Sequence, residues 1–145
     1  MTDQPNSGRM EGREHVLPVR IYYEDTDFTG AVYHANYLRY FERGRSDFLR
    51  LLGVGHVALS EVDTAFAVTR MEVEFHRAAR IDDALVIRTG FLAARGPRMT
   101  IGQRILRDDH IIASATVQVA CIDSSGRAKR PPPGLVKALA PLLAP

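Results

Sequence analysis

The hydrophobic pattern of the sequence changes from a helical period to a strand period at one point, and this change limits the possible folds. Between residues 35 and 52, apolar side chains such as Tyr37, Phe41 and Phe48 recur at three- and four-residue steps. This spacing predicts one helix of about five turns. After a loop over residues 54–64 the period becomes two. One long helix followed by several strands predicts an α+β fold.

Five strands are predicted, one before the helix and four after it. The first lies within residues 15–23, where Pro18 favours a late start or an edge position. The other four are predicted at residues 67–76, 84–94, 99–105 and 111–122. Tight turns between such strands are typical of an antiparallel meander. We therefore expect a curved five-stranded antiparallel sheet that packs on the helix, with a short terminal helix over residues 135–143.

The ends and the middle of the long helix carry further signals. Asn36 or His34 could cap its start, and Gly53 could end it as a residue just beyond the last turn. Gly44 in mid-helix costs up to about 1 kcal/mol relative to alanine, so we expect another element to pack closely there.

Composition and charge are those of an ordinary globular protein. The 145 residues are most simply one domain, expected over residues 15–145, after a polar, disordered tail over residues 1–14. The formal charge of +2 and the lack of a dense Lys/Arg run argue against nucleic-acid binding. No apolar run reaches the ~20 residues of a membrane span, so no membrane insertion is expected. The single cysteine, Cys121, excludes an intrachain disulfide and favours a reducing cytoplasm.

Residues 22–37, which join the first strand to the helix, carry the most reactive groups. Asp27 is the candidate catalytic carboxylate because it lies where the strand ends and the helix begins. The first N–H groups of a helix have no intrahelical partner and stabilise negative charge. Tyr23 lies four residues before Asp27 and His34 seven after it, so the three side chains could converge. A carboxylate can attack an acyl carbon or activate water, while a phenol and an imidazole position it and transfer protons.

The same residues also have structural interpretations. Asp25 and Asp27 could simply satisfy turn amides, and His34 could line a pocket or only cap the helix. Glu42 is a competing acid, expected to be solvated or paired with a neighbouring arginine. The remaining histidines lie on different segments, and His34 with Asp27 is two ligands short of a zinc site, so no metal is expected.

Three other residues, one cysteine and two arginines, also carry chemically relevant groups. Cys121 lies on the inward phase of the last strand, which favours a core residue over a nucleophile. Arg95 and Arg98 border a turn, where they are either solvated or dock a phosphorylated carrier. The sequence has no phosphate-binding glycine loop.

The motif Tyr-Tyr-Glu-Asp-Thr-Asp-x-x-Gly-x-Val-Tyr-His-x-x-Tyr, which begins at Tyr22, resembles that of the acyl-CoA thioesterases of the hotdog fold. The similarity extends over about residues 16–131 and is greatest to the YbgC type, which is associated with the bacterial Tol–Pal envelope system and related to 4-hydroxybenzoyl-CoA thioesterase. The resemblance implies that Asp27 is the catalytic carboxylate and that Tyr23 and His34 complete the site. It also implies that a backbone N–H at the start of the helix is the oxyanion donor.

The resemblance further implies an assembly and a reaction. Hotdog subunits pair so that their sheets continue into one another, with each active site across the dimer interface, and dimers often form tetramers. CoA binds at the surface, and Arg95 and Arg98 are the candidates for its phosphates. We expect a cytoplasmic acyl-CoA thioesterase that needs no cofactor, releases free acid and CoA, and has a functional link to the Tol–Pal system. Asp27 acts either as nucleophile, through a mixed anhydride, or as general base on water.

Two alternatives of a different class stay open at this point. One is a hotdog hydratase or dehydratase acting on an acyl carrier, with His34 as base and Glu42 as acid. The position of Asp27 outside the helix argues against it. The other is a non-catalytic subunit that binds acyl thioesters, against which the complete set of Tyr23, Asp27 and His34 argues. The acyl group itself is left open because the pocket depends on residues from two chains.

Overall fold

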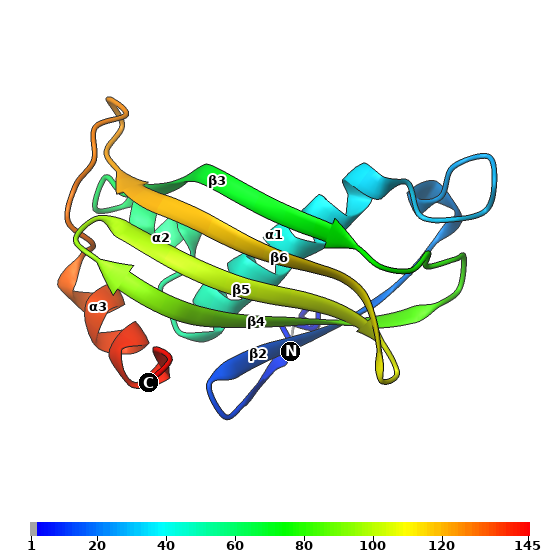
Figure 1. The fold of residues 1–145 in the computed structure, drawn as a ribbon. Helices are drawn as coiled ribbons and strands as arrows, with labels where there is room; N and C mark the ends of the chain where they lie inside the picture. The colour runs from blue at the N-terminus through cyan, green and yellow to red at the C-terminus, as the bar shows by residue number, and fades with distance from the viewer. Residues whose placement is uncertain (1–2) are drawn as a thin grey trace.

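One curved antiparallel sheet wraps around one long helix in the computed structural model, which describes residues 3–145 (Figure 1). The helices are α1 (His34–Leu51), α2 (His56–Ser60) and α3 (Pro133–Leu139), with 3-10 turns η1 (Tyr23–Asp25) and η2 (Ala140–Leu142). The strands are β1 (Arg9–Glu11), β2 (Glu14–Arg20), β3 (Ala65–Phe75), β4 (Ala84–Arg95), β5 (Arg98–Arg107) and β6 (His110–Ile122). The α+β prediction is confirmed, with six strands instead of five.

The additional strand, β1, lies in the segment that the sequence predicts as a disordered tail. It pairs with β2 in a hairpin in which Met10 lies opposite His15, and Gly12 in the turn has φ +62°. The predicted tail boundary at residue 14 is therefore wrong for residues 9–14, while residues 1 and 2 lie outside the described part of the chain. A three-residue strand with a single apolar side chain is too short to show a period-two pattern.

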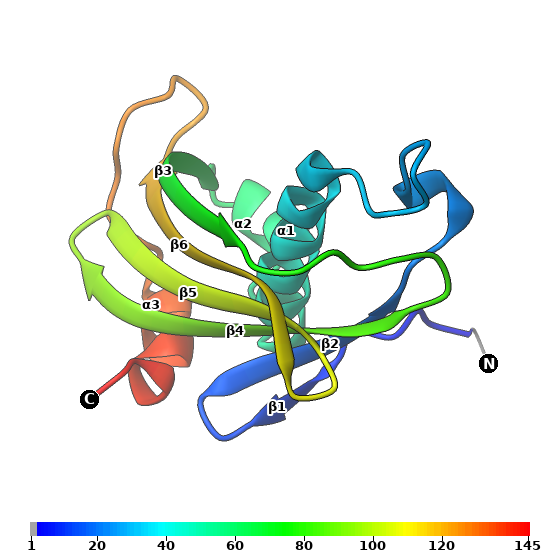
Figure 2. The same ribbon diagram turned by 45° about the vertical axis from the view of Figure 1, so that its right-hand side comes forward.

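The strand order across the sheet is β1-β2-β4-β5-β6-β3. The predicted meander is correct for β4, β5 and β6, but β3 pairs with β6 and not with β4. The segment over residues 76–83 therefore connects β3, at one edge of the sheet, to β4 in its interior. Figure 2 shows the sheet curving around α1, with α3 at the end of the sheet near the β4–β5 hairpin.

A β-bulge in β3 changes which side chains face the helix. The register with β6 shifts between Val68 and Arg70, so Thr69 is an extra residue. The side chains of Phe66 and Val68 face the inner side of the sheet before the bulge, and that of Met71 faces the same side after it. The single alternation predicted for this strand is thus wrong on its N-terminal side.

Gly44 brings α1 close to the sheet, as predicted. A Cβ atom at Gly44 would lie 2.8 Å from both Ile87 Cγ2 and Thr89 Oγ1, on the buried face of β4. Beside it, Gln103 Nε2 donates to the Phe41 carbonyl at 2.8 Å and to Thr89 Oγ1 at 2.9 Å. These bonds satisfy the polar groups that the close approach buries.

The two ends of α1 differ from each other. The N-cap is Tyr33, without a side-chain cap, so the predicted capping by His34 or Asn36 is wrong. The predicted end at Gly53 is confirmed: its φ is +78°, and its N–H donates to the Arg50 carbonyl at 3.0 Å. Within residues 3–145, no helix has the length and apolar character needed to cross a membrane.

Candidate active site

The loop between β2 and α1 forms a small hairpin at the N-terminal end of α1 (Figure 1). Thr26 and Val32 form an isolated bridge, and Asp27 N–H donates to the Ala31 carbonyl at 2.8 Å. The chain reverses at Gly30, whose φ of +83° favours glycine. Because of this local pairing, Asp27 has a defined position even though it belongs to no long strand or helix.

Asp27 is oriented by Thr29. Its Oδ1 atom accepts the Thr29 backbone N–H at 2.8 Å and the Thr29 hydroxyl at 2.6 Å. These two bonds lower the pKa of Asp27 against a smaller effect of desolvation. The backbone N–H of Ala31 and, more weakly, the positive charge of Arg80 act in the same direction as the Thr29 bonds. No hydrogen bond within residues 3–145 uses Oδ2. The structural interpretation of Asp27 as a turn residue is therefore correct for one oxygen, and the other oxygen is available for chemistry.

An open hollow of about 400 Å³ lies at Asp27 and contains one of its two predicted partners. The hollow is lined by Tyr23, Thr26, Asp27, Phe28, Gly30 and Ile81. The side chain of Tyr23 is 82% exposed and that of Phe28 is 100% exposed. Two large apolar side chains left in solvent beside a reactive carboxylate are typical of a surface that a ligand or another subunit covers.

The segment over residues 76–83 supports this loop from the other side. Val32 N–H donates to the Ala79 carbonyl at 2.8 Å, and Ala31 forms a bridge with Arg80. The Tyr37 hydroxyl accepts the Ala79 N–H at 3.0 Å in the core. The segment that connects β3 to β4 thus also fixes the loop that carries Asp27.

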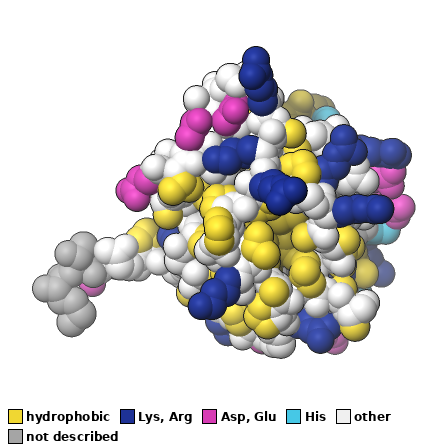
Figure 3. All heavy atoms as spheres, turned by 90° about the vertical axis from the view of Figure 1, so that its left-hand side faces the viewer, with side chains coloured by type: hydrophobic (Ala, Val, Ile, Leu, Met, Phe, Trp, Pro, Cys, Tyr) yellow, Lys and Arg dark blue, Asp and Glu magenta, His cyan; other side chains and the backbone are white. Residues whose placement is uncertain are grey.

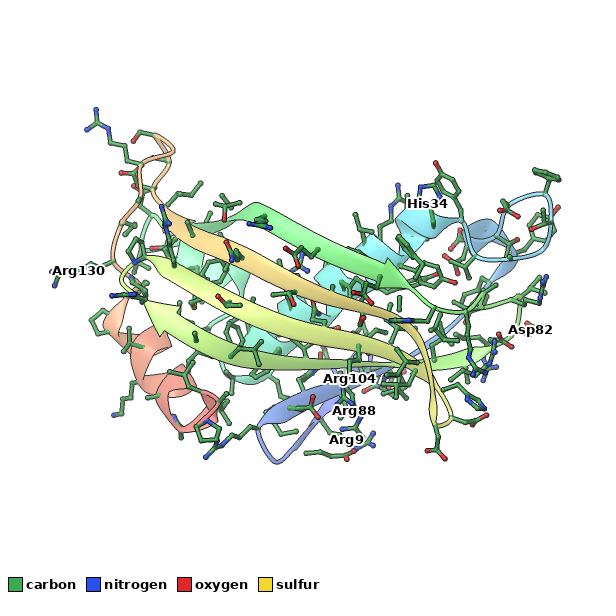
Figure 4. The ribbon with its side chains drawn as sticks, in the orientation of Figure 1. Arg9, His34, Asp82, Arg88, Arg104 and Arg130 are labelled. Carbon is green, nitrogen blue, oxygen red and sulfur yellow. The ribbon has the colours of Figure 1, made fainter. Side chains whose placement is uncertain are left out.

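His34, the first residue of α1, does not line the Asp27 hollow. Its ring lies 4.7 Å from that of Tyr33 and 6.1 Å from that of Phe75 in β3. Figure 4 shows it at the start of the helix. Within residues 3–145 no acceptor takes the backbone N–H of His34 or Ala35. These two N–H groups are thus available to an oxyanion.

A second polar cluster lies farther along α1, and the sequence did not predict it. The Ser46 hydroxyl donates to Glu42 Oε1 at 2.7 Å and lies 2.9 Å from His56 Nε2. Because the hydroxyl proton goes to the carboxylate, His56 Nε2 must donate, and Ser46 is not activated as a nucleophile. Of the two expectations for Glu42, the solvated one is correct: its side chain is 57% exposed, and no ion pair with an arginine is present within residues 3–145. The cluster borders a pocket of about 120 Å³ with otherwise mainly apolar walls, including Leu49 and Phe66.

The remaining candidates lie away from Asp27. Arg95 and Arg98 pair across the β4–β5 turn, at the opposite end of the sheet from the Asp27 loop (Figure 1). Figure 3 views that end and shows Lys and Arg side chains around exposed hydrophobic ones. Cys121 is fully buried, and burial raises the pKa of its thiol to about 11, in agreement with the predicted core role. Residues 3–145 hold no group of three or more side chains arranged to bind a metal.

Two comparisons with known sequences match this chain. A family model described as the thioesterase-like superfamily matches residues 22–139. The acyl-CoA thioesterase YbgC of Haemophilus influenzae is 42% identical over 108 residues, which are 74% of this chain and 79% of the relative. The acyl-CoA thioester hydrolase YbgC of Escherichia coli O6:H1 is 42% identical over 107 residues, which are 73% of this chain and 80% of the relative.

Solved structures agree with the sequence comparisons. A probable thioesterase from Bartonella henselae has 41% sequence identity and a TM-score of 0.79, and the match covers 82% of this chain and 99% of that one. A hypothetical protein from Thermus thermophilus, TT1821, has 26% identity and a TM-score of 0.84, and the match covers 91% and 99%. The chain therefore has the predicted hotdog fold and belongs to the thioesterase-like superfamily, as a member of its YbgC type.

Proposed function

We propose that this protein hydrolyses an acyl-CoA thioester to a free acid and CoA, with Asp27 as the catalytic carboxylate. The YbgC relatives, 42% identical over most of the chain, support the reaction. The observation that carries the role of Asp27 is its geometry. Thr29 holds Oδ1, while Oδ2 is free beside exposed apolar side chains. A carboxylate that is ionised, fixed and accessible is what either route of thioester hydrolysis requires.

Asp27 can promote thioester hydrolysis by two routes in this geometry. Asp27 Oδ2 attacks the thioester carbon, the C–S bond breaks to release CoA, and water then hydrolyses the mixed anhydride. Alternatively, Oδ2 takes a proton from a water that attacks the same carbon. In both routes the carbonyl oxygen becomes negative, and the free N–H groups of His34 and Ala35 are the candidate donors that stabilise it. Tyr23 is at the rim of the hollow, where it can contact the substrate.

A second copy of the chain is the proposed partner for the outer edge of β3. This strand has 11 residues and pairs on one side only, and a long edge of this kind is rarely left open. A two-fold axis at Met71 would place Arg70 of each subunit opposite Glu72 of its partner, twice per dimer. Opposite charges directly across two strands are favourable. Shifting the axis by two residues to Val73 would instead place Glu72 opposite Glu74.

The dimer is tested by exchanging these charges. Arg70→Glu should weaken association because it places two carboxylates opposite each other, and Arg70→Glu/Glu72→Arg should restore it. Sedimentation over a range of protein concentrations measures the effect. Equal association of the single and double variants would contradict the register, and a wild-type monomer at micromolar concentration would contradict the dimer.

The same pairing suggests where the acyl group binds. The β3 strands run in opposite directions, so Phe75, next to His34, would lie close to the partner's Phe66, which borders the 120 Å³ pocket. We place the acyl group in that pocket. Arg95 and Arg98 stay proposed ligands of the CoA phosphates, but only as residues of a neighbouring subunit, because they are remote from Asp27 in their own chain.

The function is tested with Asp27→Asn. This change keeps the shape of the side chain but removes the nucleophile or base, and turnover of acyl-CoA should fall by a factor on the order of 10²–10⁴. A panel of acyl-CoAs, assayed by release of free thiol, first identifies a substrate. Asp25→Asn and Glu42→Gln are matched controls that should reduce turnover much less. If Asp27→Asn retains turnover and Glu42→Gln abolishes it, the catalytic carboxylate is on α1 and the proposed role of Asp27 is wrong.

The cytoplasmic location and the link to the Tol–Pal system remain predictions. The first rests on the single buried cysteine, and the second on the resemblance to the YbgC type.

A further inference from the structure

The backbone pairing of the Asp27 loop places Arg80 on the segment next to it. Asp27 is bonded to Ala31, and Ala31 forms a bridge with Arg80. The three residues therefore lie on adjacent backbone segments, which are about 4.8 Å apart when paired in this way. Ile81, the next residue, lines the same hollow as Asp27. An arginine side chain at this position is long enough to bring its charge near the Asp27 carboxylate.

No hydrogen bond or ion pair within residues 3–145 uses the guanidinium of Arg80. Asp83, an acid three residues along the same segment, is already engaged. Asp83 Oδ2 accepts the Arg80 backbone N–H at 2.8 Å and Arg107 Nη1 at 2.7 Å. The backbone of Arg80 is thus fixed, while its guanidinium makes no hydrogen bond or ion pair in the described part of the chain and acts on the carboxylates of Asp83 and Asp27 only through its charge. This differs from Arg107, whose charge is used to hold the segment in place.

When an acyl thioester binds, the positive charge of Arg80 becomes more important for the ionised form of Asp27. In the free protein Asp27 is exposed, so water and Thr29 stabilise its ionised form. A substrate that covers Tyr23, Phe28 and Ile81 displaces that water, and desolvation raises the pKa of a carboxylate. Both hydrolysis routes require the ionised form at that moment.

The other charged groups around the site do not supply this stabilisation. Glu24 and Asp25 on the loop itself, and Asp82 and Asp83 on the supporting segment, are acids and supply no positive charge. At the start of α1, the Tyr37 hydroxyl is buried and bonded to the Ala79 N–H, and His34 packs against aromatic rings.

We propose that Arg80 is a positioning residue that keeps Asp27 ionised when the acyl thioester covers it. The inference rests on the proposed function of Asp27. It differs from a role of Arg80 as a ligand of the CoA phosphates, which would affect CoA substrates alone.

The first test uses the free protein and needs no substrate. The carboxyl carbon of Asp27 is followed by NMR as a function of pH in the wild type, Arg80→Gln, Arg80→Lys and Arg77→Gln. Arg77 is an exposed arginine on the same segment and serves as the matched control. Arg80→Gln should raise the pKa of Asp27, whereas Arg80→Lys and Arg77→Gln should leave it near the wild-type value. An unchanged titration in Arg80→Gln overturns the proposal.

The second test measures kcat against pH, which reports the pKa values of the enzyme–substrate complex, with an acyl-CoA and with the corresponding acyl-pantetheine, which lacks the nucleotide phosphates. For Arg80→Gln the acid limb should move to higher pH with both substrates, which gives about 3- to 10-fold lower kcat on that limb, and Arg80→Lys should rescue it. A loss confined to acyl-CoA identifies a phosphate contact and overturns the proposal. If the wild type hydrolyses no thioester, or Asp27→Asn keeps its turnover, the proposed function fails, and the NMR titration still decides whether Arg80 acts on Asp27.

Discussion

Replacing Gly44 by alanine tests how closely α1 lies on the sheet. In an exposed helix the change would stabilise by up to about 1 kcal/mol because alanine has the higher helix propensity. Here the new Cβ would lie 2.8 Å from Ile87 Cγ2 and from Thr89 Oγ1, about 1 Å closer than ordinary carbon contacts. Both neighbours are fully buried on β4 and cannot move aside. The overpacking costs about 1–3 kcal/mol.

A shift of the helix that relieves this clash has a cost of its own. Gln103 Nε2 donates to the Phe41 carbonyl at 2.8 Å, and a movement of about 1 Å breaks that bond in the core. An unsatisfied buried group costs about 1–3 kcal/mol. Either response costs about 1–3 kcal/mol, and the gain in propensity of up to about 1 kcal/mol is subtracted, so Gly44→Ala should lower the free energy of unfolding by roughly 1–2 kcal/mol.

Urea unfolding followed by circular dichroism measures this change, with Arg39→Ala as the control at an exposed position of the same helix. The control should shift the free energy of unfolding by no more than about 0.5 kcal/mol. A Gly44→Ala variant as stable as the wild type, or more stable, would refute the argument that the helix and sheet are in tight contact here.

Two further predictions concern Thr29 and His15. Thr29→Val removes the hydroxyl that holds Asp27, so it should raise the pKa of Asp27 and move the acid limb of the pH–rate profile to higher pH. Turnover should fall by about 3–10-fold, the scale of one hydrogen bond. Thr29→Ser should keep the wild-type profile and turnover, and equal profiles for the two variants would contradict the role of the Thr29 hydroxyl. His15 is fully buried, with Nε2 2.7 Å from the Ser7 carbonyl, and burial lowers its pKa below the ordinary value of 6.5. Below about pH 6.5 the His15 side chain is therefore protonated in the unfolded chain but not in the native state. The free energy of unfolding should fall on acidification through this range, by at most about 1.4 kcal/mol per pH unit. His15→Gln keeps a donor for the Ser7 carbonyl but cannot be protonated, so its free energy of unfolding should fall less than that of the wild type between about pH 7.5 and pH 5. Urea unfolding at the two pH values measures the difference. An identical pH dependence in the two proteins would exclude His15 as its source.

The sequence was most informative where one side-chain period runs without interruption. The helix and strands β4, β5 and β6 were predicted to within three residues at each end, because each has a long, regular apolar pattern. The position of β3 was not predictable in this way. Its pattern indicates a strand but not its neighbour, and the bulge at Thr69 reverses the inward face without a glycine or proline to mark it. A single inserted residue is enough to do this.

For the candidate site, the sequence predicted the carboxylate but not the groups around it. Asp27 stands out by its place between a strand and a helix, and its hollow also contains Tyr23. Thr29 occupies one of the unspecified positions of the motif, although its side chain orients Asp27. Arg80 is more than fifty residues away in sequence, and only the path of residues 76–83 brings it beside Ala31. The Ser46–His56 contact likewise depends on the turn after α1, and no local pattern marks it.

The bonding between the Asp27 loop and the segment over residues 76–83 has a consequence for hydrogen exchange. The Asp27 amide donates within the loop to Ala31, the Val32 amide donates across to Ala79, and the Ala79 amide donates to the Tyr37 hydroxyl on α1. Neither segment can open alone without breaking bonds of the other. Their amides should therefore exchange together, as one cooperative unit less protected than the interior strands of the sheet. Rare joint opening of this unit would expose the Asp27 loop and the chain leaving β3 in the same event. The protection of the loop should therefore rise when β3 gains a partner strand.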